Sequence, residues 1–232
     1  MRSALLLAGT LAFVTAPFWS PGFGGFRADQ FPIPQEDPPV QPAGYAFAIW
    51  SAIYLWLLVS AVFGLLRRAE NPGWDAVRVP LTISMALGAP WITVATLSPV
   101  WASVLIFGML ISALWALRRA PSEDRWLLRA PLGLYAGWLT AASLVSVGLL
   151  GAGYGIGPDA LGWAWVVVLT AIVAGVALQR ALAGTPLYAV GVAWALAAVA
   201  ARNVGDQMLL ALLAAIGAAA LSAVAFQSTR RG

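Results

Sequence analysis

Long apolar runs separated by short polar segments make up almost the whole chain. Each run is close to the roughly 20 residues that an α-helix needs to cross a bilayer. The runs lack the two-residue alternation of barrel strands, and lipid tolerates only helices or closed barrels. The pattern therefore predicts an all-α fold, a polytopic bundle of transmembrane helices. Eight segments are expected: 3–18, 44–66, 79–97, 99–117, 130–150, 160–179, 185–201 and 206–226.

Two of these segments need a further argument. The stretch 79–117 is too long for one span, and Pro99 cannot continue a helix, so we expect a tight hairpin at Ser98 and Pro99. The first segment follows Arg2 as a signal peptide would. Pro17, Phe18 and Trp19 interrupt the run where a small-residue cleavage site would stand, so we expect a retained helix.

The arginines indicate an orientation. With eight spans, eleven of the 13 basic residues fall on one side of the membrane, and only Arg27 and Arg202 fall on the other. The positive-inside rule then places both termini in the cytoplasm. We expect a multi-pass protein of a bacterial inner membrane. The net charge of +4 thus orients helices, and we expect no nucleic-acid partner. An anionic-lipid or partner patch is the alternative interpretation of the arginines.

Composition excludes several chemistries. The chain is 61% hydrophobic and only 9% charged, with no Cys and no His, so thiolate catalysis, disulfides and the usual haem and zinc ligands are absent. No Asp, Glu, Lys or Arg lies inside an expected span, which argues against a proton-coupled transporter. With no acid–base constellation, we expect no enzyme activity.

Two loops stand out. The external loop 19–43 is rich in Pro, Gly and aromatic residues, which favours a lid over the bundle mouth; the alternative is a mobile linker. The cytoplasmic loop 118–129 is predicted to form a short amphipathic surface helix that begins at Ser122. At the external turn before the last helix, Arg202 and Asp206 are expected to form an ion pair.

Ten of the 12 tryptophans fall into two groups. Those near predicted helix ends are expected in the interfacial belts: Trp19, Trp74, Trp101, Trp126 and Trp163. Those inside predicted helices need another explanation: Trp50, Trp56, Trp91, Trp138 and Trp194.

Aromatic residues share faces on two of the predicted helices. Phe47, Trp50 and Tyr54 are three and four residues apart, and Tyr135, Trp138 and Ala142 repeat this spacing. Two such faces are able to line a flat apolar cavity. Ordinary helix packing is the alternative, and from the spacing alone it is the safer interpretation.

At these residues the sequence resembles the tryptophan-rich sensory proteins, also called the TspO or peripheral benzodiazepine receptor family. The second-helix motif reads Pro42-Ala-Gly-Tyr45-Ala-Phe47-Ala-Ile-Trp50-Ser-Ala-Ile-Tyr54, and the fifth-helix motif reads Leu134-Tyr135-Ala-Gly-Trp138-Leu-Thr-Ala-Ala142 followed by Val145-Ser146. Trp91 stands at the family's third-helix Trp. Leu134 and Ser146 replace the family's Pro and Asn, and Gly88 replaces another Asn. The chain therefore resembles a long, divergent branch of the family.

The resemblance implies a five-helix core that binds porphyrins, sterols or aromatic drugs in an external-side pocket closed by the first loop. It also implies a dimer, and a sensory or receptor role linked to tetrapyrroles. Carried over by position, the ligand-binding residues would be Tyr45, Phe47, Trp50, Tyr54, Trp91, Tyr135, Trp138, Ala142 and Ser146. Arg27 would meet a propionate. Since the chain has no His, any porphyrin would bind without axial ligation, and no covalent cofactor or metal is expected.

We therefore divide the chain into a TspO-like bundle, residues 1–150, and three additional helices with a short tail, residues 151–232. The added helices are rich in small residues, and the stretch 217–220 offers either a docking face or a face buried within the chain. Three functions follow. The first is binding or sensing of a flat apolar ligand, and the second is a structural or assembly subunit of a larger, pigment-containing membrane complex. The third is passive transport of apolar cargo. In each case membrane lipids surround the chain.

Overall fold

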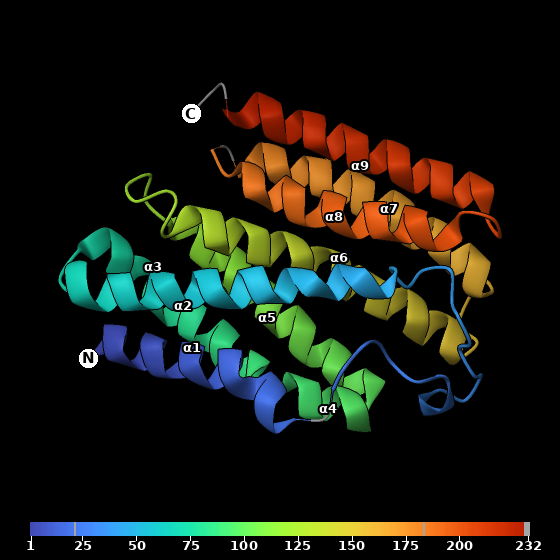
Figure 1. Ribbon diagram of the computed structural model, residues 1–232, viewed down its shortest axis with the longest axis horizontal. Helices are drawn as coiled ribbons and strands as arrows, with labels where there is room; N and C mark the ends of the chain where they lie inside the picture. The colour runs from blue at the N-terminus through green and yellow to red at the C-terminus, as the bar shows by residue number, and fades with distance from the viewer. Residues whose placement is uncertain (21, 183, 230–232) are drawn as a thin grey trace.

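The computed structural model describes residues 1–20, 22–182 and 184–229, and over these ranges the chain is helical with no strand. The predicted all-α membrane bundle is confirmed: the helices run side by side, and both termini lie at the same end (Figure 1). The α-helices are α1 (Arg2–Trp19), α2 (Ile49–Arg67), α3 (Pro72–Gly88), α4 (Trp91–Leu97), α5 (Pro99–Arg119), α6 (Arg129–Gly153), α7 (Ala160–Ala181), α8 (Pro186–Asn203) and α9 (Met208–Thr229). Two short 3-10 helices are η1 (Ala28–Gln30) and η2 (Gly44–Ala48).

The helices identify a multi-pass membrane protein. Within the described ranges, 7 helical segments are long and apolar enough to cross a membrane; η2 continues into α2, and α3 with α4 counts as one segment. The remaining predicted span, 185–201, is α8, an 18-residue helix that packs against α6 and α9. The hairpin at Ser98 and Pro99 is present: Ser98 caps α5 and Pro99 is its first residue.

The predicted start of the third segment, residue 79, is wrong. Its helix begins at Pro72 rather than at 79, because Asn71 caps it by accepting a hydrogen bond from the Trp74 backbone N–H. It ends at Gly88, and a turn at Ala89 and Pro90 separates it from α4. Two charged residues, Asp75 and Arg78, therefore lie within the first turns of a spanning segment that was expected to hold none.

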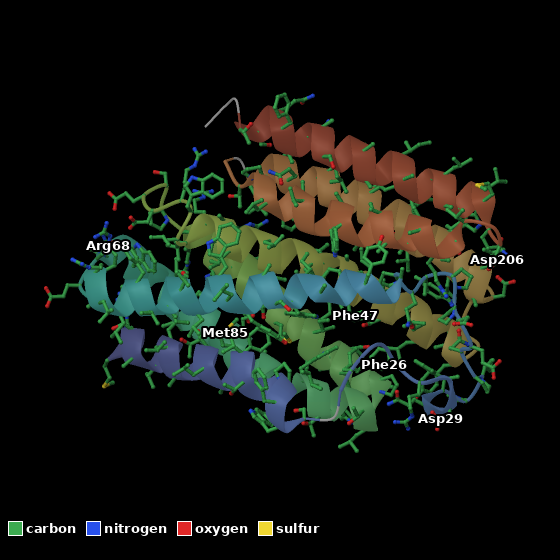
Figure 2. All side chains as sticks on the ribbon, in the orientation of Figure 1. Phe26, Asp29, Phe47, Arg68, Met85 and Asp206 are labelled. Carbon is green, nitrogen blue, oxygen red and sulfur yellow. The ribbon has the colours of Figure 1, made fainter. Side chains whose placement is uncertain are left out.

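We call the end of the bundle that holds both termini the arginine-rich end. The arginines there flank α1, α2, α5, α6 and α7, as the charge pattern predicted; Arg230 and Arg231 lie outside the described residues. Figure 2 shows Arg68 and Asp206 at opposite ends of the bundle, with Met85 between them. Charged groups thus gather at the two ends of the helices.

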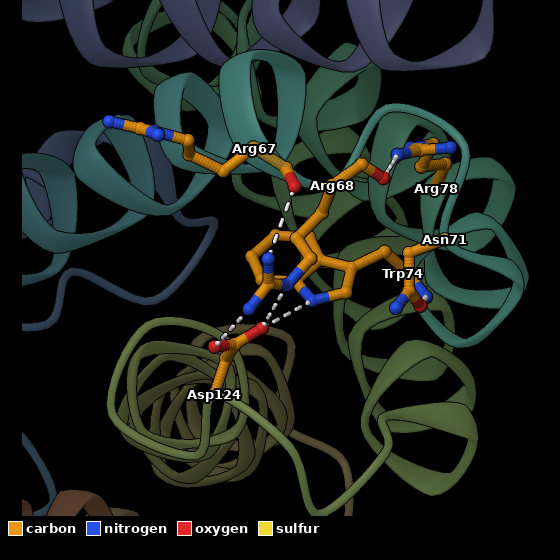
Figure 3. A network of polar contacts seen from close by, with 6 residues as sticks. All are labelled: Arg67, Arg68, Asn71, Trp74, Arg78 and Asp124. Carbon is orange, nitrogen blue, oxygen red and sulfur yellow. Dashed lines mark hydrogen bonds and ion pairs between the residues drawn. The ribbon is translucent and has the colours of Figure 1, made fainter.

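A polar network closes the arginine-rich end (Figure 3). The Asp124 carboxylate accepts hydrogen bonds from Arg68 Nε at 2.7 Å and from Trp74 Nε1 at 3.1 Å. The hydrogen bond from the Arg68 guanidinium, supported by the one from Trp74, holds the pKa of Asp124 below its ordinary value. Arg78, 3% exposed, donates to the Arg68 and Ala69 carbonyls.

This network corrects two predictions. The segment 121–128 forms turns instead of a surface helix: Pro121 follows the end of α5, and Asp124 has a left-handed backbone conformation with φ at 50°. Trp74 is 1% exposed and bonded to Asp124, so it is a core residue and not part of an interfacial belt. Trp126 is 60% exposed, as a belt residue would be, and Trp56 stacks on it with ring centroids 6.4 Å apart.

The opposite end, which we call the loop end, carries the long segment between α1 and η2. Arg202 forms its ion pair with Asp37 of this segment and not with Asp206, so the predicted pair is wrong. The reason is that the segment returns to the end of α8, which no local pattern reveals. Within α9, Gly217 is buried against Ile172 and Leu196, whereas Ala219 and Ala220 are exposed, so only part of the small-residue stretch packs inside the chain.

Candidate functional site

An apolar cavity lies near the loop end, between α2, α5, α6 and α8 and beneath the long loop. Its volume is about 60 Å³. Six of the nine predicted ligand-binding residues line it: Phe47, Trp50, Trp91, Trp138, Ala142 and Ser146. Because these residues come from η2, α2, α4 and α6, the fold brings together positions almost 100 residues apart.

A second, larger cavity of about 310 Å³ lies beside the first, between α1 and α2. Val14, Pro17 and Ser51 line only this outer cavity, as does Tyr54, another of the predicted residues. Both cavities share Phe23, Phe47, Trp50 and Trp91, so these four aromatic side chains form the partition between them.

The aromatic rings of the partition meet edge to face. The Trp138 ring lies 6.2 Å from Trp50 at 86° and 6.1 Å from Phe47 at 81°. Phe23 meets Trp91 at 4.9 Å and 78°. Such T-shaped pairs are favourable contacts in themselves. In this conformation the rings therefore pack on one another and leave no flat slot between parallel faces.

Two predicted residues line neither of the two cavities. Tyr135 is fully buried, and its hydroxyl is 2.9 Å from Ser84 Oγ, so it joins α6 to α3. Tyr45 is 52% exposed and its ring packs against Trp194 at 5.7 Å. Arg27 is paired with Asp29 at 3.0 Å and does not line the cavity.

The walls of the inner cavity hold few polar groups and no ionisable side chain. Among the described residues, the buried indole N–H of Trp138 has no hydrogen-bond partner. The Ser146 hydroxyl donates to the Ala142 carbonyl at 3.0 Å, and the Gln41 side chain reaches the cavity from the loop. The part of the chain that the structure describes contains no cluster of three or more His, Cys, Asp or Glu residues. The site is thus suited to a neutral apolar molecule that offers a hydrogen-bond acceptor.

Several lining residues were not singled out from the sequence. Phe23, Phe26 and Gln41 come from the loop, and Ala195 comes from α8. The aromatic content of the loop was a usable signal for the first two, because exposed Phe side chains need a surface to cover. Ala195 gave no signal, since alanine occupies much of α8 and any of these alanines fits a packed helix.

Comparison with known proteins gives a family. The family model described as TSPO-like protein matches residues 33–227. This match begins in the long loop and includes α8, which supplies Ala195 to the cavity. Helix α8 lies beyond residue 150, the end of the five-helix bundle predicted from the sequence. No curated protein matches the chain. No solved structure matches it.

Proposed function

This chain belongs to the family of TSPO-like proteins, and from that premise we propose that its cavity binds a flat, apolar ligand of the tetrapyrrole or sterol class. The observation that carries the proposal is the convergence of six predicted residues from four elements on one cavity. Ordinary packing of neighbouring helices does not require that the residues of separate motifs meet at one empty space. The protein would act as a sensor or receptor in the membrane.

The wall chemistry supports this ligand class. Aromatic faces stabilise a planar ring system by stacking, and a cavity without charged side chains favours a neutral or weakly polar ring. The chain has no His, so a porphyrin would be held by its faces and edges and not through an axial imidazole. The free Trp138 N–H would donate to an acceptor on the ligand.

The size of the cavity requires a movement on binding. Pockets for drug-sized ligands measure about 300–1,000 Å³, whereas the inner cavity measures about 60 Å³ and its neighbour about 310 Å³. Displacement of the shared partition, above all Phe23 of the loop, would join the two spaces. Binding therefore includes an outward movement of the loop, which agrees with its interpretation as a lid.

The experiment is a titration of the purified protein with protoporphyrin, read by quenching of Trp fluorescence. We expect Trp50→Ala and Trp138→Ala each to weaken binding about three- to tenfold, because each removes a ring worth about 0.5–1.5 kcal/mol in stacking. Trp115→Ala is the matched control, since Trp115 is 41% exposed on α5 and lines neither cavity. Equal affinity in all four proteins would contradict the proposal.

A structural role is the second candidate. It is favoured by the edge-to-face packing of the rings, which fill the space between α2 and α6. In this role the chain would be an assembly subunit of a larger membrane complex. Gentle solubilisation followed by native electrophoresis tests this role. A species that contains a partner protein is expected for an assembly subunit, and a monomer or homodimer excludes the subunit role.

A further inference from the structure

The loop segment 37–46 lies along α8 in an antiparallel register. As residue numbers rise along the loop, the contacts move from the last residues of α8 back toward its middle. Asp37 with Arg202 and the Pro39 carbonyl with Asn203, at 2.8 Å, lie at the end of α8; the Ala43 N–H with the Ala198 carbonyl, at 3.1 Å, and the Ala46 carbonyl with Trp194 Nε1, at 2.9 Å, lie progressively earlier. The segment is therefore attached to one face of α8 over about two and a half turns.

Asn203 is the buried polar residue of this contact. It is 3% exposed, and its side-chain Nδ2 donates to the Pro39 and Val199 carbonyls, each at 2.8 Å. One amide group thus joins the loop to the last turn of α8. The Pro39 carbonyl is half-buried, and the loss of its donor there costs free energy, so the closed position of the loop depends on this side chain. The Arg202 pair is more exposed and contributes less.

The attached segment carries part of the cavity wall. Gln41 and Pro42 lie between the contacts of Pro39 and Ala43, and Phe47 directly follows Ala46. Ala195, on the same stretch of α8, lines the cavity itself. Helix α8 therefore supplies one wall of the cavity and fixes the position of another, although it lies outside the predicted five-helix core, residues 1–150.

We propose that α8 is the anchor that holds the loop closed over the cavity, and that Asn203 is its main positioning residue. This inference deepens the proposed function. Only its expected effect on ligand dissociation rests on that function. Other loop contacts, from Gln30 Nε2 to the Ala95 carbonyl at 2.9 Å and from the Ile33 N–H to the Gly153 carbonyl at 2.9 Å, are independent of α8. Loss of the anchor therefore releases segment 37–47 and leaves the rest of the loop attached.

The test is hydrogen–deuterium exchange of the full chain in lipid nanodiscs, with Asn203→Ala beside the wild type. We expect the amides of 37–47, and above all the Ala43 N–H, to exchange about three- to tenfold faster, as loss of a buried hydrogen bond predicts. Trp194→Phe is a milder second variant, because it removes only the Nε1 donor and keeps a ring against Tyr45. Asn71→Ala, the same substitution at the arginine-rich end, is the control.

The ligand is followed separately. With bound protoporphyrin, we expect Asn203→Ala and Trp194→Phe to raise the dissociation rate about three- to tenfold without slowing association, and Asn71→Ala to change neither rate. Exchange that is unchanged in both loop variants, or raised evenly over all helices, would overturn the anchor. If the wild type binds no protoporphyrin, the proposed ligand is wrong, and the exchange experiment still decides whether α8 holds the loop.

Discussion

Asp124 shows how one side chain fixes a loop that the sequence alone assigns to a helix. Its two oxygens accept from Arg68 Nε and Nη2 at 2.7 and 3.1 Å, and one of them also accepts from Trp74 Nε1. A bidentate guanidinium–carboxylate pair is stronger and more directional than a single ionic contact. The turn 121–128 is therefore tied to the α2–α3 connection through a left-handed residue that would otherwise be unfavourable.

This pair predicts a pH dependence of stability. The folded-state pKa of Asp124 is lowered from 3.8 by the Arg68 hydrogen bond, so its contribution is complete above the ordinary value and is lost as the pH falls through the lower folded value. Thermal unfolding in detergent should give Asp124→Asn a lower Tm than wild type at pH 7, and the gap should begin to narrow as the pH falls below about 4. A gap that does not vary with pH would show that the charge is unimportant.

At the scale of the element, two glycines decide how closely α6 and α8 approach. A Cβ on Gly137 would lie 2.1 Å from the Tyr188 carbonyl oxygen, and one on Gly191 would lie 2.8 Å from the Leu134 carbonyl oxygen. These contacts are with backbone, which cannot rotate away as a side chain can. Small residues thus allow the backbones to touch, as is common between membrane helices. The close contact brings Ala195 of α8 to the cavity that Trp138 lines.

Gly137→Ala is expected to force the two helices apart and to lower the free energy of unfolding by about 1–3 kcal/mol. The matched control is Gly9→Ala, because a Cβ there meets Met85 at 3.5 Å, an ordinary contact, and alanine favours the helix by about 1 kcal/mol. Thermal unfolding of both variants in the same detergent measures the effect. A Gly137→Ala protein as stable as Gly9→Ala would mean that α6 and α8 adjust without strain.

For the whole molecule, the segregation of arginine to one end gives an orientation. Apart from Arg27 and Arg202, the arginines of the described chain lie at the end that holds both termini. We propose that this end faces the cytoplasm of a bacterial inner membrane, since the positive-inside rule acts on short loops of this kind. The cavity would then lie toward the external side.

The absence of native cysteine makes this orientation measurable. Ser122→Cys at the arginine-rich end and Glu36→Cys at the loop end are both exposed positions. In intact cells, a membrane-impermeant maleimide should label Glu36→Cys and spare Ser122→Cys. After the membrane is opened, both should react. Labelling of Ser122→Cys alone in intact cells would reverse the proposed orientation.

The sequence by itself determined the features that follow from local composition. Apolar runs of the length of a bilayer gave the helices, and Ser98 with Pro99 placed a helix boundary correctly, because these signals act within a few residues of the chain. The spacing of Phe47 and Trp50, and of Trp138 and Ala142, identified the faces that meet at the cavity.

Only the tertiary structure decided which distant residues complete these faces. Trp74 is buried because Asp124 reaches it across 50 residues, and Arg202 binds Asp37 across 165. Ala195 lines the cavity because two glycines let α8 approach α6. Such contacts depend on how helices pack, and packing is set by the shapes of surfaces that lie far apart in the chain. The chain thus determines its helices locally, and its cavity forms only when they meet.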